Sequence, residues 1–203
     1  MNFYERYVLP QLIDLVCALP TFQRERGKVV PLATGRVLEI GIGTGRNMPF
    51  YRRDAVQCVC GVDPGLHPRA RRRAQALGVE VAELPLSAER IPADDHSFDC
   101  AVCTFSLCTI PDPLAALSEI RRTLRPGGRL LFAEHGAAPD AAVRRWQDRV
   151  TPYWKHIGGG CHLNREIPEL IRRAGFRLES LSSGYAPGPR VLTYLHSGCA
   201  VIH

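Results

Sequence analysis

The sequence predicts an α/β fold built on a doubly wound, mostly parallel sheet of seven strands, with helices on both faces. Five short apolar runs recur along the chain with little alternation of polar residues, as strands buried on both faces do. Segments with helical periodicity separate several of these runs, which is the order of a parallel sheet with crossover helices. Two further runs near the C-terminus, separated by a stretch rich in glycine and proline, indicate an antiparallel pair at the sheet edge.

Before the first strand, residues 2–19 have an amphipathic pattern that predicts a helix, kinked or split at Pro10. No repeat or linker divides the chain, so we expect residues 1–203 to form one domain, with an N-terminal helical cap at 1–30 and a cap insertion at 137–170 before the last two strands. We expect strands at 36–41, 57–63, 79–84, 98–104 and 128–134, helices at 46–53, 67–77 and 113–124, and the edge pair at 176–182 and 191–201.

Composition limits the compartment and the partners. The 203 residues carry a net charge of +6, which fits either nucleic acid binding or an arginine-rich solvated surface, and we favour the surface because the charges are scattered. Cys100 and Cys103 lie three apart in one predicted strand, so they face opposite sides and do not indicate a metal site. Without a signal peptide or an apolar run of ~20 residues, we expect a cytoplasmic protein with no transmembrane segment. The amphipathic N-terminal helix leaves peripheral membrane contact open.

A glycine-rich turn follows the first predicted strand. It reads Glu39-Ile40-Gly41-Ile42-Gly43-Thr44-Gly45. Glycines leave no Cβ in the way, so the backbone can turn tightly and approach a ligand. Asp63 ends the second strand, where a carboxylate can accept hydrogen bonds from ribose hydroxyls. The pattern therefore predicts a nucleotide-type cofactor site.

In a doubly wound sheet, the ligand crevice lies at the carboxyl ends of the strands where the strand order reverses. We therefore expect the chemistry to come from residues that directly follow the predicted strands. These positions include Gly41, Gly43, Gly45, Asn47, Asp63, Pro64, Ala88, Glu89, Thr104 and His135.

The spacing of the glycines separates two kinds of cofactor. A dinucleotide fingerprint needs Gly-x-Gly-x-x-Gly, but Arg46 stands where its third glycine belongs. The turn, with its preceding acid Glu39, instead resembles motif I of the Rossmann-like class I S-adenosylmethionine-dependent methyltransferases. The resemblance implies that S-adenosyl-L-methionine is the cofactor, held by Glu39 and the strand-end residues from Gly41 to Thr104 named above. A nicotinamide dehydrogenase remains the alternative within this fold.

The segment from Ser87 to Asp99 resembles the stretch that lines the adenine in that family. There an Asp-Ala pair commonly meets the ring, whereas here Ser87 replaces the acid and Ala88 is retained. The resemblance implies contacts from the Ala88 backbone and from Glu89. After the fourth strand, Cys103-Thr104-Phe105-Ser106 stands in place of the Asn-Pro-Pro-Tyr-like box of amino-methylating enzymes, which argues against a nucleic acid substrate.

A second resemblance extends over much of the chain and is carried by motifs that recur in order. Together these motifs are similar to the methyltransferase-like enzymes of animals that methylate alkyl thiols, and to their bacterial relatives. The membrane-anchoring segment that begins the animal enzymes is not seen here, so membrane attachment is not implied. The motifs are Tyr7-x-x-Pro10, Glu39 to Gly45 with Asn47 and Tyr51, Cys103 to Cys108, Glu134-His135, Trp146, Pro152, Trp154 and Gly160 to Arg165.

These observations predict an enzyme that moves a methyl group from S-adenosylmethionine to a small-molecule acceptor, most directly a thiol sulfur, without a metal ion. His135, directly after the fifth strand, is the preferred general base, and His162 is the second candidate. Phenol, quinone and phospholipid-amine acceptors stay open as alternatives, as does a non-catalytic module that only binds the cofactor. The sequence does not indicate an oligomeric state.

Overall fold

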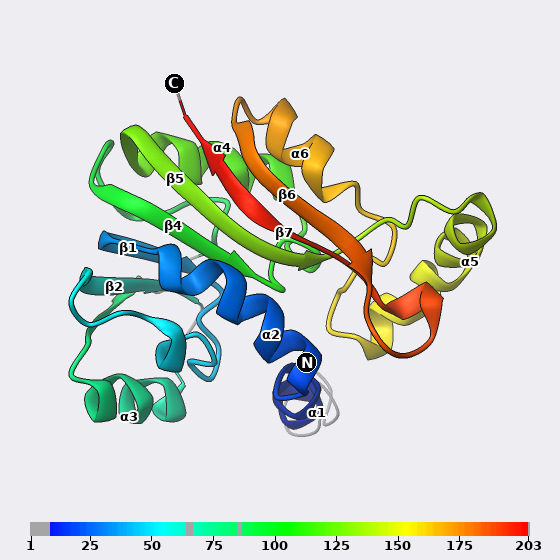
Figure 1. Ribbon diagram of the computed structural model, residues 1–203, viewed down its shortest axis with the longest axis horizontal. Helices are drawn as coiled ribbons and strands as arrows, with labels where there is room; N and C mark the ends of the chain where they lie inside the picture. Colours follow the sequence, from blue (N-terminus) through cyan, green and yellow to red (C-terminus); the bar gives the residue numbers. More distant parts are fainter. Residues whose placement is uncertain (1–8, 64–66, 85–86, 203) are drawn as a thin grey trace.

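The strands of the chain lie side by side in one seven-stranded sheet with the order β3-β2-β1-β4-β5-β7-β6 (Figure 1). The computed structural model describes residues 9–63, 67–84 and 87–202. Strands β1 to β5 are parallel, whereas β7 runs antiparallel to both β5 and β6. The strands are β1 (Gly35–Ile40), β2 (Val56–Val62), β3 (Glu80–Leu84), β4 (Phe98–Thr104), β5 (Leu124–His135), β6 (Arg177–Tyr185) and β7 (Tyr194–Val201).

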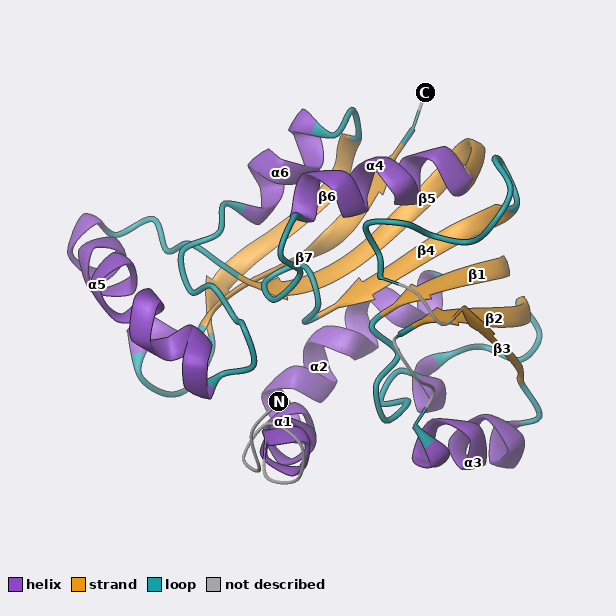
Figure 2. Ribbon diagram, turned by 180° about the vertical axis from the view of Figure 1, so that it is seen from behind, coloured by secondary structure: helices purple, strands orange, loops and turns teal. Residues whose placement is uncertain are grey.

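Helices cover both faces of this sheet. Helices α2 and α3 lie on one face, and α4 and α6 lie on the other, as the views from front and back show (Figures 1 and 2). Helix α5 extends beyond the edge strands, and α1 lies beyond the carboxyl ends of β1 and β4. The helices are α1 (Leu9–Cys17), α2 (Pro20–Val29), α3 (Pro68–Leu77), α4 (Pro113–Thr123), α5 (Ala141–Ile157) and α6 (Ile167–Arg173).

The sheet separates two hydrophobic clusters because successive side chains of a strand point to opposite faces. Val37 belongs to the cluster under α2 and α3, and its neighbour Leu38 belongs to the cluster under α4 and α6. Cys100 and Cys103 divide in the same way, which confirms that they face opposite sides. The predicted fold class, with its antiparallel edge pair, is confirmed.

The helix predicted at 46–53 is wrong. This segment forms a turn followed by a short 3₁₀ helix at Met48–Phe50, with hydrogen bonds from each amide to the carbonyl three residues earlier. Pro49 accounts for the difference, because it has no amide hydrogen to donate and it disfavours the α conformation of Met48. The chain therefore leaves β1 through a compact turn instead of a regular crossover helix.

The N-terminal segment is helical, as predicted, over its described part. The break between α1 and α2 falls just before Pro20, which is the first residue of α2, and Pro10 lies near the start of α1. The predicted residues Tyr7 and Pro64 lie outside the described ranges. No helix in those ranges is both long and apolar enough to cross a lipid bilayer.

Candidate active site

A cavity of about 400 Å³ lies at the carboxyl ends of β1 and β4, where the strand order reverses. This is the crevice position expected of a doubly wound sheet, and the volume falls in the usual range for small-molecule sites. Its wall comes from the ends of β1, β2 and β4, the glycine turn, α1 and α2. The lining residues are Leu9, Ile13, Asp14, Cys17, Arg26, Glu39, Gly41, Ile42, Gly43, Thr44, Arg46, Asn47, Asp63, His67, Thr104, Phe105, Ser106 and Gly159.

The three glycines of the turn serve different purposes. All three have positive φ, but a Cβ on Gly41 would lie 2.3 Å from the Ser106 hydroxyl, and one on Gly45 would lie 2.8 Å from the backbone of Ala70. Gly41 and Gly45 are thus required by packing within the protein. A Cβ on Gly43 would meet only the carbonyl of Gly41, at 3.9 Å, so Gly43 is the position that leaves room for a ligand.

Asp63 joins this turn from the end of β2. Its Oδ2 accepts a hydrogen bond from the amide of Gly43 at 3.0 Å, and the half-buried carboxylate borders the cavity. One oxygen is therefore used to hold the turn, while the carboxylate still has lone pairs for a ligand hydroxyl.

Beneath the turn, a buried network fixes Glu39. Its Oε1 accepts from Asn47 Nδ2 at 3.0 Å, and its Oε2 accepts from the Tyr51 hydroxyl at 2.8 Å. Asn47 Nδ2 also donates to the hydroxyl of Thr104, at 3.0 Å. Burial raises the pKa of Glu39 to about 7, against the lowering effect of Tyr51 and Asn47. The predicted residues Glu39, Asn47 and Thr104 are thus brought together at the floor of the cavity.

Arg26 is a cavity residue that the sequence analysis missed. It is only 4% exposed, although it belongs to the short helix α2. Its Nε donates to Asn47 Oδ1 at 3.0 Å, and its guanidinium lies 4.9 Å from the ring centre of Phe105. In a chain with many arginines, no sequence signal distinguished this one.

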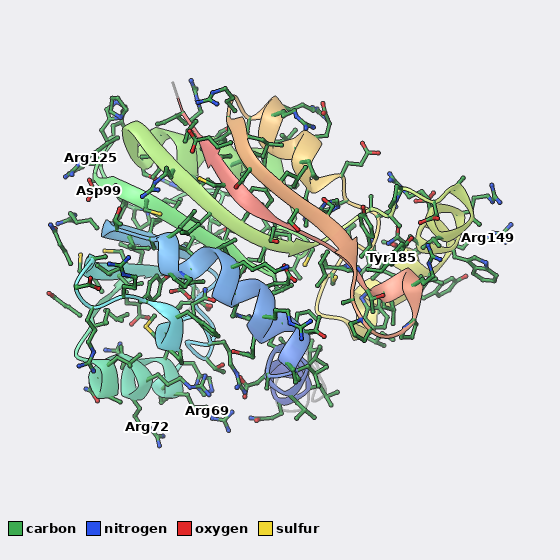
Figure 3. All side chains as sticks on the ribbon, in the orientation of Figure 1. Arg69, Arg72, Asp99, Arg125, Arg149 and Tyr185 are labelled. Atoms are coloured by element: carbon green, nitrogen blue, oxygen red, sulfur yellow. The ribbon has the colours of Figure 1, made fainter. Side chains whose placement is uncertain are left out.

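Helix α1 is tied to the glycine turn through Asp14, which also escaped the sequence analysis. The Asp14 carboxylate accepts from Arg46 Nε at 2.8 Å and Nη2 at 2.7 Å, and from the Thr44 hydroxyl. Arg69 extends from α3 on the side of α1 (Figure 3), and its Nη1 donates to Oδ2 of Asp14 at 3.1 Å. The hydrogen bonds from Arg46 lower the pKa of Asp14 to about 2. This helix therefore covers the cavity, held by a charged contact.

The loop after β4 is held by a buried carboxylate at the end of β5. Glu134 accepts hydrogen bonds from the amides of Ser106, Leu107 and Cys108 at 2.9 to 3.2 Å. Its burial raises its pKa to about 7, although these amides favour the charged form. The loop begins at Phe105, which has a φ of +56°, a conformation that non-glycine residues seldom adopt. Glu134 thus stabilises a constrained turn beside the cavity.

Two predicted cofactor residues do not border the cavity. Ala88 is buried in the hydrophobic cluster under α4 and α6. The Glu89 carboxylate accepts from the Asp112 amide at 2.8 Å and from the hydroxyl of Ser87. Both follow the end of β3, which β2 separates from the pair β1 and β4 at the cavity floor.

The two predicted bases also lie away from the cavity lining. His135 is 6% exposed, and its Nδ1 lies 3.7 Å from the sulfur of Cys161, while its Nε2 has no hydrogen-bond partner within the described ranges. His162 follows Cys161, and its Nδ1 likewise has no partner there. His162 thus lies on the loop that continues from Gly159 at the edge of the cavity, and His135, at the end of β5, contacts the same loop through Cys161.

Within the described ranges, no group of three or more His, Cys, Asp or Glu side chains is placed to hold a metal ion. The residues that do converge suit an organic cofactor with hydroxyl and charged groups. Gly43 leaves room along the turn, Asp63 offers a half-buried carboxylate, and Arg26 offers a buried positive charge. Together with the strand order, this site defines a Rossmann-like fold with its ligand crevice at the strand-order reversal.

Comparison with known proteins identifies the family. Residues 4–181 match the family described as a methyltransferase domain, and the chain belongs to it. The human thiol S-methyltransferase TMT1B is 38% identical over 153 residues, which cover 71% of this chain and 62% of that protein. Human thiol S-methyltransferase TMT1A is 31% identical over 91% of this chain and 75% of its own length. The chain thus spans about three-fifths of the length of the TMT1B proteins that it matches.

Other similar proteins have names that refer to other methyl acceptors. The demethylmenaquinone methyltransferase of Thermus thermophilus is 31% identical, covering 84% of this chain and 82% of that protein. Among solved structures, the 1,6-didemethyltoxoflavin-N1-methyltransferase of Burkholderia thailandensis has a TM-score of 0.70 at 20% identity, covering 96% of this chain and 83% of that one. At this identity the structural likeness supports the fold alone.

Proposed function

We propose that the cavity binds S-adenosylmethionine and that the protein transfers its methyl group to a small-molecule acceptor, most directly the sulfur of a thiol. The observation that carries the proposal is the contact between Asp63 and the amide of Gly43 at the edge of a cavity that lies at the strand-order reversal. The family match and the names of the most similar relatives support the same reaction class.

Asp63 and the backbone of Gly43 would hold the nucleoside part, and the Glu39 network with Arg26 would hold the charged amino-acid part. When bound, the cofactor supplies a methyl group on a positively charged sulfur. Ala88 and Glu89 remain predictions for the adenine end, since they lie outside the cavity lining, and Pro64 remains a predicted cofactor residue. The proposed reaction uses no metal ion.

The thiol is favoured because of the cavity wall as well as the relatives. Leu9, Ile13 and Phe105 give the cavity an apolar side, from which water would be excluded under α1. A thiolate that attacks a sulfonium loses charge as the bond forms, so a low-polarity surrounding favours the transition state. His135 is the proposed base, with His162 second, because both lie on or beside the loop that reaches the cavity at Gly159.

Other acceptors have specific support too. The similarity to a demethylmenaquinone methyltransferase favours a quinone carbon, and the match to a phosphatidylethanolamine N-methyltransferase from Cereibacter sphaeroides favours a lipid amine. We propose a cytoplasmic location, which the eight cysteines support because all of them are free thiols in the structure.

A screen with methyl-labelled cofactor tests the proposal. Small alkyl thiols, catechols, a reduced naphthoquinone and phosphatidylethanolamine vesicles are each incubated with the protein, and labelled products are separated by chromatography. We expect a labelled thioether and formation of S-adenosylhomocysteine. Labelled product only from another acceptor class would overturn the thiol assignment. Cofactor binding without product from any acceptor would favour the non-catalytic module.

A further inference from the structure

Two cysteines from separate loops meet beside the cavity. Cys108 lies on the loop after β4 and is 3% exposed, whereas Cys161 lies on the loop after α5 and is half-buried. The amide of His162 donates to the carbonyl of Cys108 at 2.8 Å, which holds the two backbones together. The two thiols are close enough for each to shift the pKa of the other.

The surroundings of the two sulfurs differ. The Sγ of Cys161 lies 3.7 Å from Nδ1 of His135, and the indole of Trp154 is adjacent, with no hydrogen-bond partner for its Nε1 within the described ranges. The contacts with Cys108 and His135 lower the pKa of the Cys161 thiol. The same contact, together with burial, raises the pKa of Cys108. Cys161 is therefore the partner that carries thiolate character, and it is the one that solvent reaches.

We propose that Cys108 and Cys161 form a redox-active pair that a hydroperoxide oxidises to a disulfide, with Cys161 as the attacking sulfur. The Cys161 thiolate attacks the distal oxygen of the peroxide, the O–O bond breaks, and the leaving oxygen takes up a proton. Cys161 becomes a sulfenic acid. The Cys108 sulfur then attacks this sulfur, the S–O bond breaks, and the hydroxyl leaves as water with the proton of Cys108. Two thiols are oxidised and one peroxide is reduced.

A second pair of neighbouring cysteines, Cys58 and Cys60, offers a comparison. Cys58 and Cys60 are neighbours on one face of β2, and burial raises the pKa of Cys60 to about 11. Neither has a contact like the one between Cys161 and His135 in the described structure. We therefore expect this pair to resist peroxide under conditions that oxidise Cys108 and Cys161.

A Cys108–Cys161 disulfide would also affect the cavity. The first loop carries Phe105 and Ser106, the second carries Gly159, and all three residues line the cavity. The bond would tie the two loops covalently on one side of the site. The pairing itself does not depend on the proposed methyl transfer, so each can fail without the other.

The test is thiol counting and peptide mapping on the full chain. The reduced protein is treated with hydrogen peroxide, unfolded, and titrated for thiols, and a tryptic digest is analysed by mass spectrometry. We expect two fewer thiols than the eight in the sequence, a cross-linked peptide containing Cys108 and Cys161, and full recovery after dithiothreitol. A cross-link at other cysteines, or no thiol loss before the protein unfolds, would overturn the proposal.

Matched variants assign the roles. Cys161→Ser should slow thiol loss roughly tenfold or more, whereas Cys108→Ser should leave a sulfenic acid on Cys161 that dimedone traps. Cys60→Ser should behave like the wild type. Equal oxidation of Cys161→Ser and the wild type would contradict the assignment. If a variant does not fold, alkylation of the wild type by iodoacetamide at pH 6 tests the assignment instead. Cys161 should then be alkylated faster than Cys17.

Discussion

At the residue scale, similar side chains have different duties according to their neighbours. Of three glycines in one turn, Gly41 and Gly45 avoid collisions with Ser106 and Ala70, and only Gly43 leaves space for a ligand. A motif of alternating glycines is therefore partly a packing requirement and partly a binding surface. Substitution at Gly43 should affect the ligand, whereas substitution at Gly41 or Gly45 should also distort the fold.

The role of His135 is best examined through pH. The substitution His135→Ala should lower turnover of a small thiol by roughly 10²-fold at pH 7, because no base would then take the thiol proton. At pH 9 the loss should be less than about threefold, since free thiols with a pKa near ~8.5 ionise unaided. Initial rates at the two pH values measure this.

His156→Ala is the matched control, because His156 is exposed on α5 and should change neither rate. An equal loss of activity at both pH values would remove His135 from the role of base and leave it as a structural partner of Cys161.

At the element scale, Glu134 connects the end of β5 to the loop after β4. Three amides of that loop point at one buried carboxylate, so the loop conformation depends on a single side chain. The strain at Phe105, with its positive φ, is held in place by the same contacts. The cavity wall at Phe105 and Ser106 therefore depends on the hydrogen bonds between Glu134 and this loop.

The raised pKa of Glu134 has a consequence for stability. Because burial raises the pKa from 4.5 to about 7, the folded protein holds this proton more tightly than the unfolded chain. The free energy of unfolding should therefore fall as the pH rises through that interval. Glu134→Gln cannot titrate, so its decrease between pH 5 and pH 8 should be smaller than that of the wild type by roughly 1–3 kcal/mol.

Urea denaturation at the two pH values gives the comparison. Only the difference between variant and wild type is used, because Glu39 and His196 also have shifted pKa values and titrate in both proteins. The exposed Glu80→Gln serves as control and should follow the wild type. Parallel pH dependences for Glu134→Gln and wild type would contradict the assignment of Glu134.

The sequence predicted elements best where the pattern is local and repeated. The five parallel strands were placed within a few residues, except that β5 begins earlier, at Leu124, and pairs with β4 from there. The helix at 46–53 failed because Pro49 acts through hydrogen-bonding geometry that hydrophobic periodicity does not report. The position of α1 over the cavity depends on the charged contact between Asp14 and Arg46, which are far apart in the sequence.

At the scale of the whole molecule, the site arises from topology. The carboxyl ends of β1 and β4 come together because the strand order reverses between them, which brings Glu39 and Thr104 to one floor. Gly43 and Asp63 could be predicted because strand ends carry the chemistry of this fold. Arg26 could not, since its burial depends on how α2 crosses the sheet. The predicted bases His135 and His162 lie just outside the cavity lining, because the order of strands and loops along the chain does not determine which side chains reach the cavity.

The central claim is that this cavity holds S-adenosylmethionine through Asp63, and calorimetric titration of the purified protein tests it most directly. We predict saturable binding of about one equivalent, at least ~10-fold weaker in Asp63→Asn because a charged hydrogen-bond acceptor is lost. The exposed Asp54→Asn should bind like the wild type. An absence of heat with S-adenosylmethionine, or an affinity unchanged by Asp63→Asn, would contradict the account.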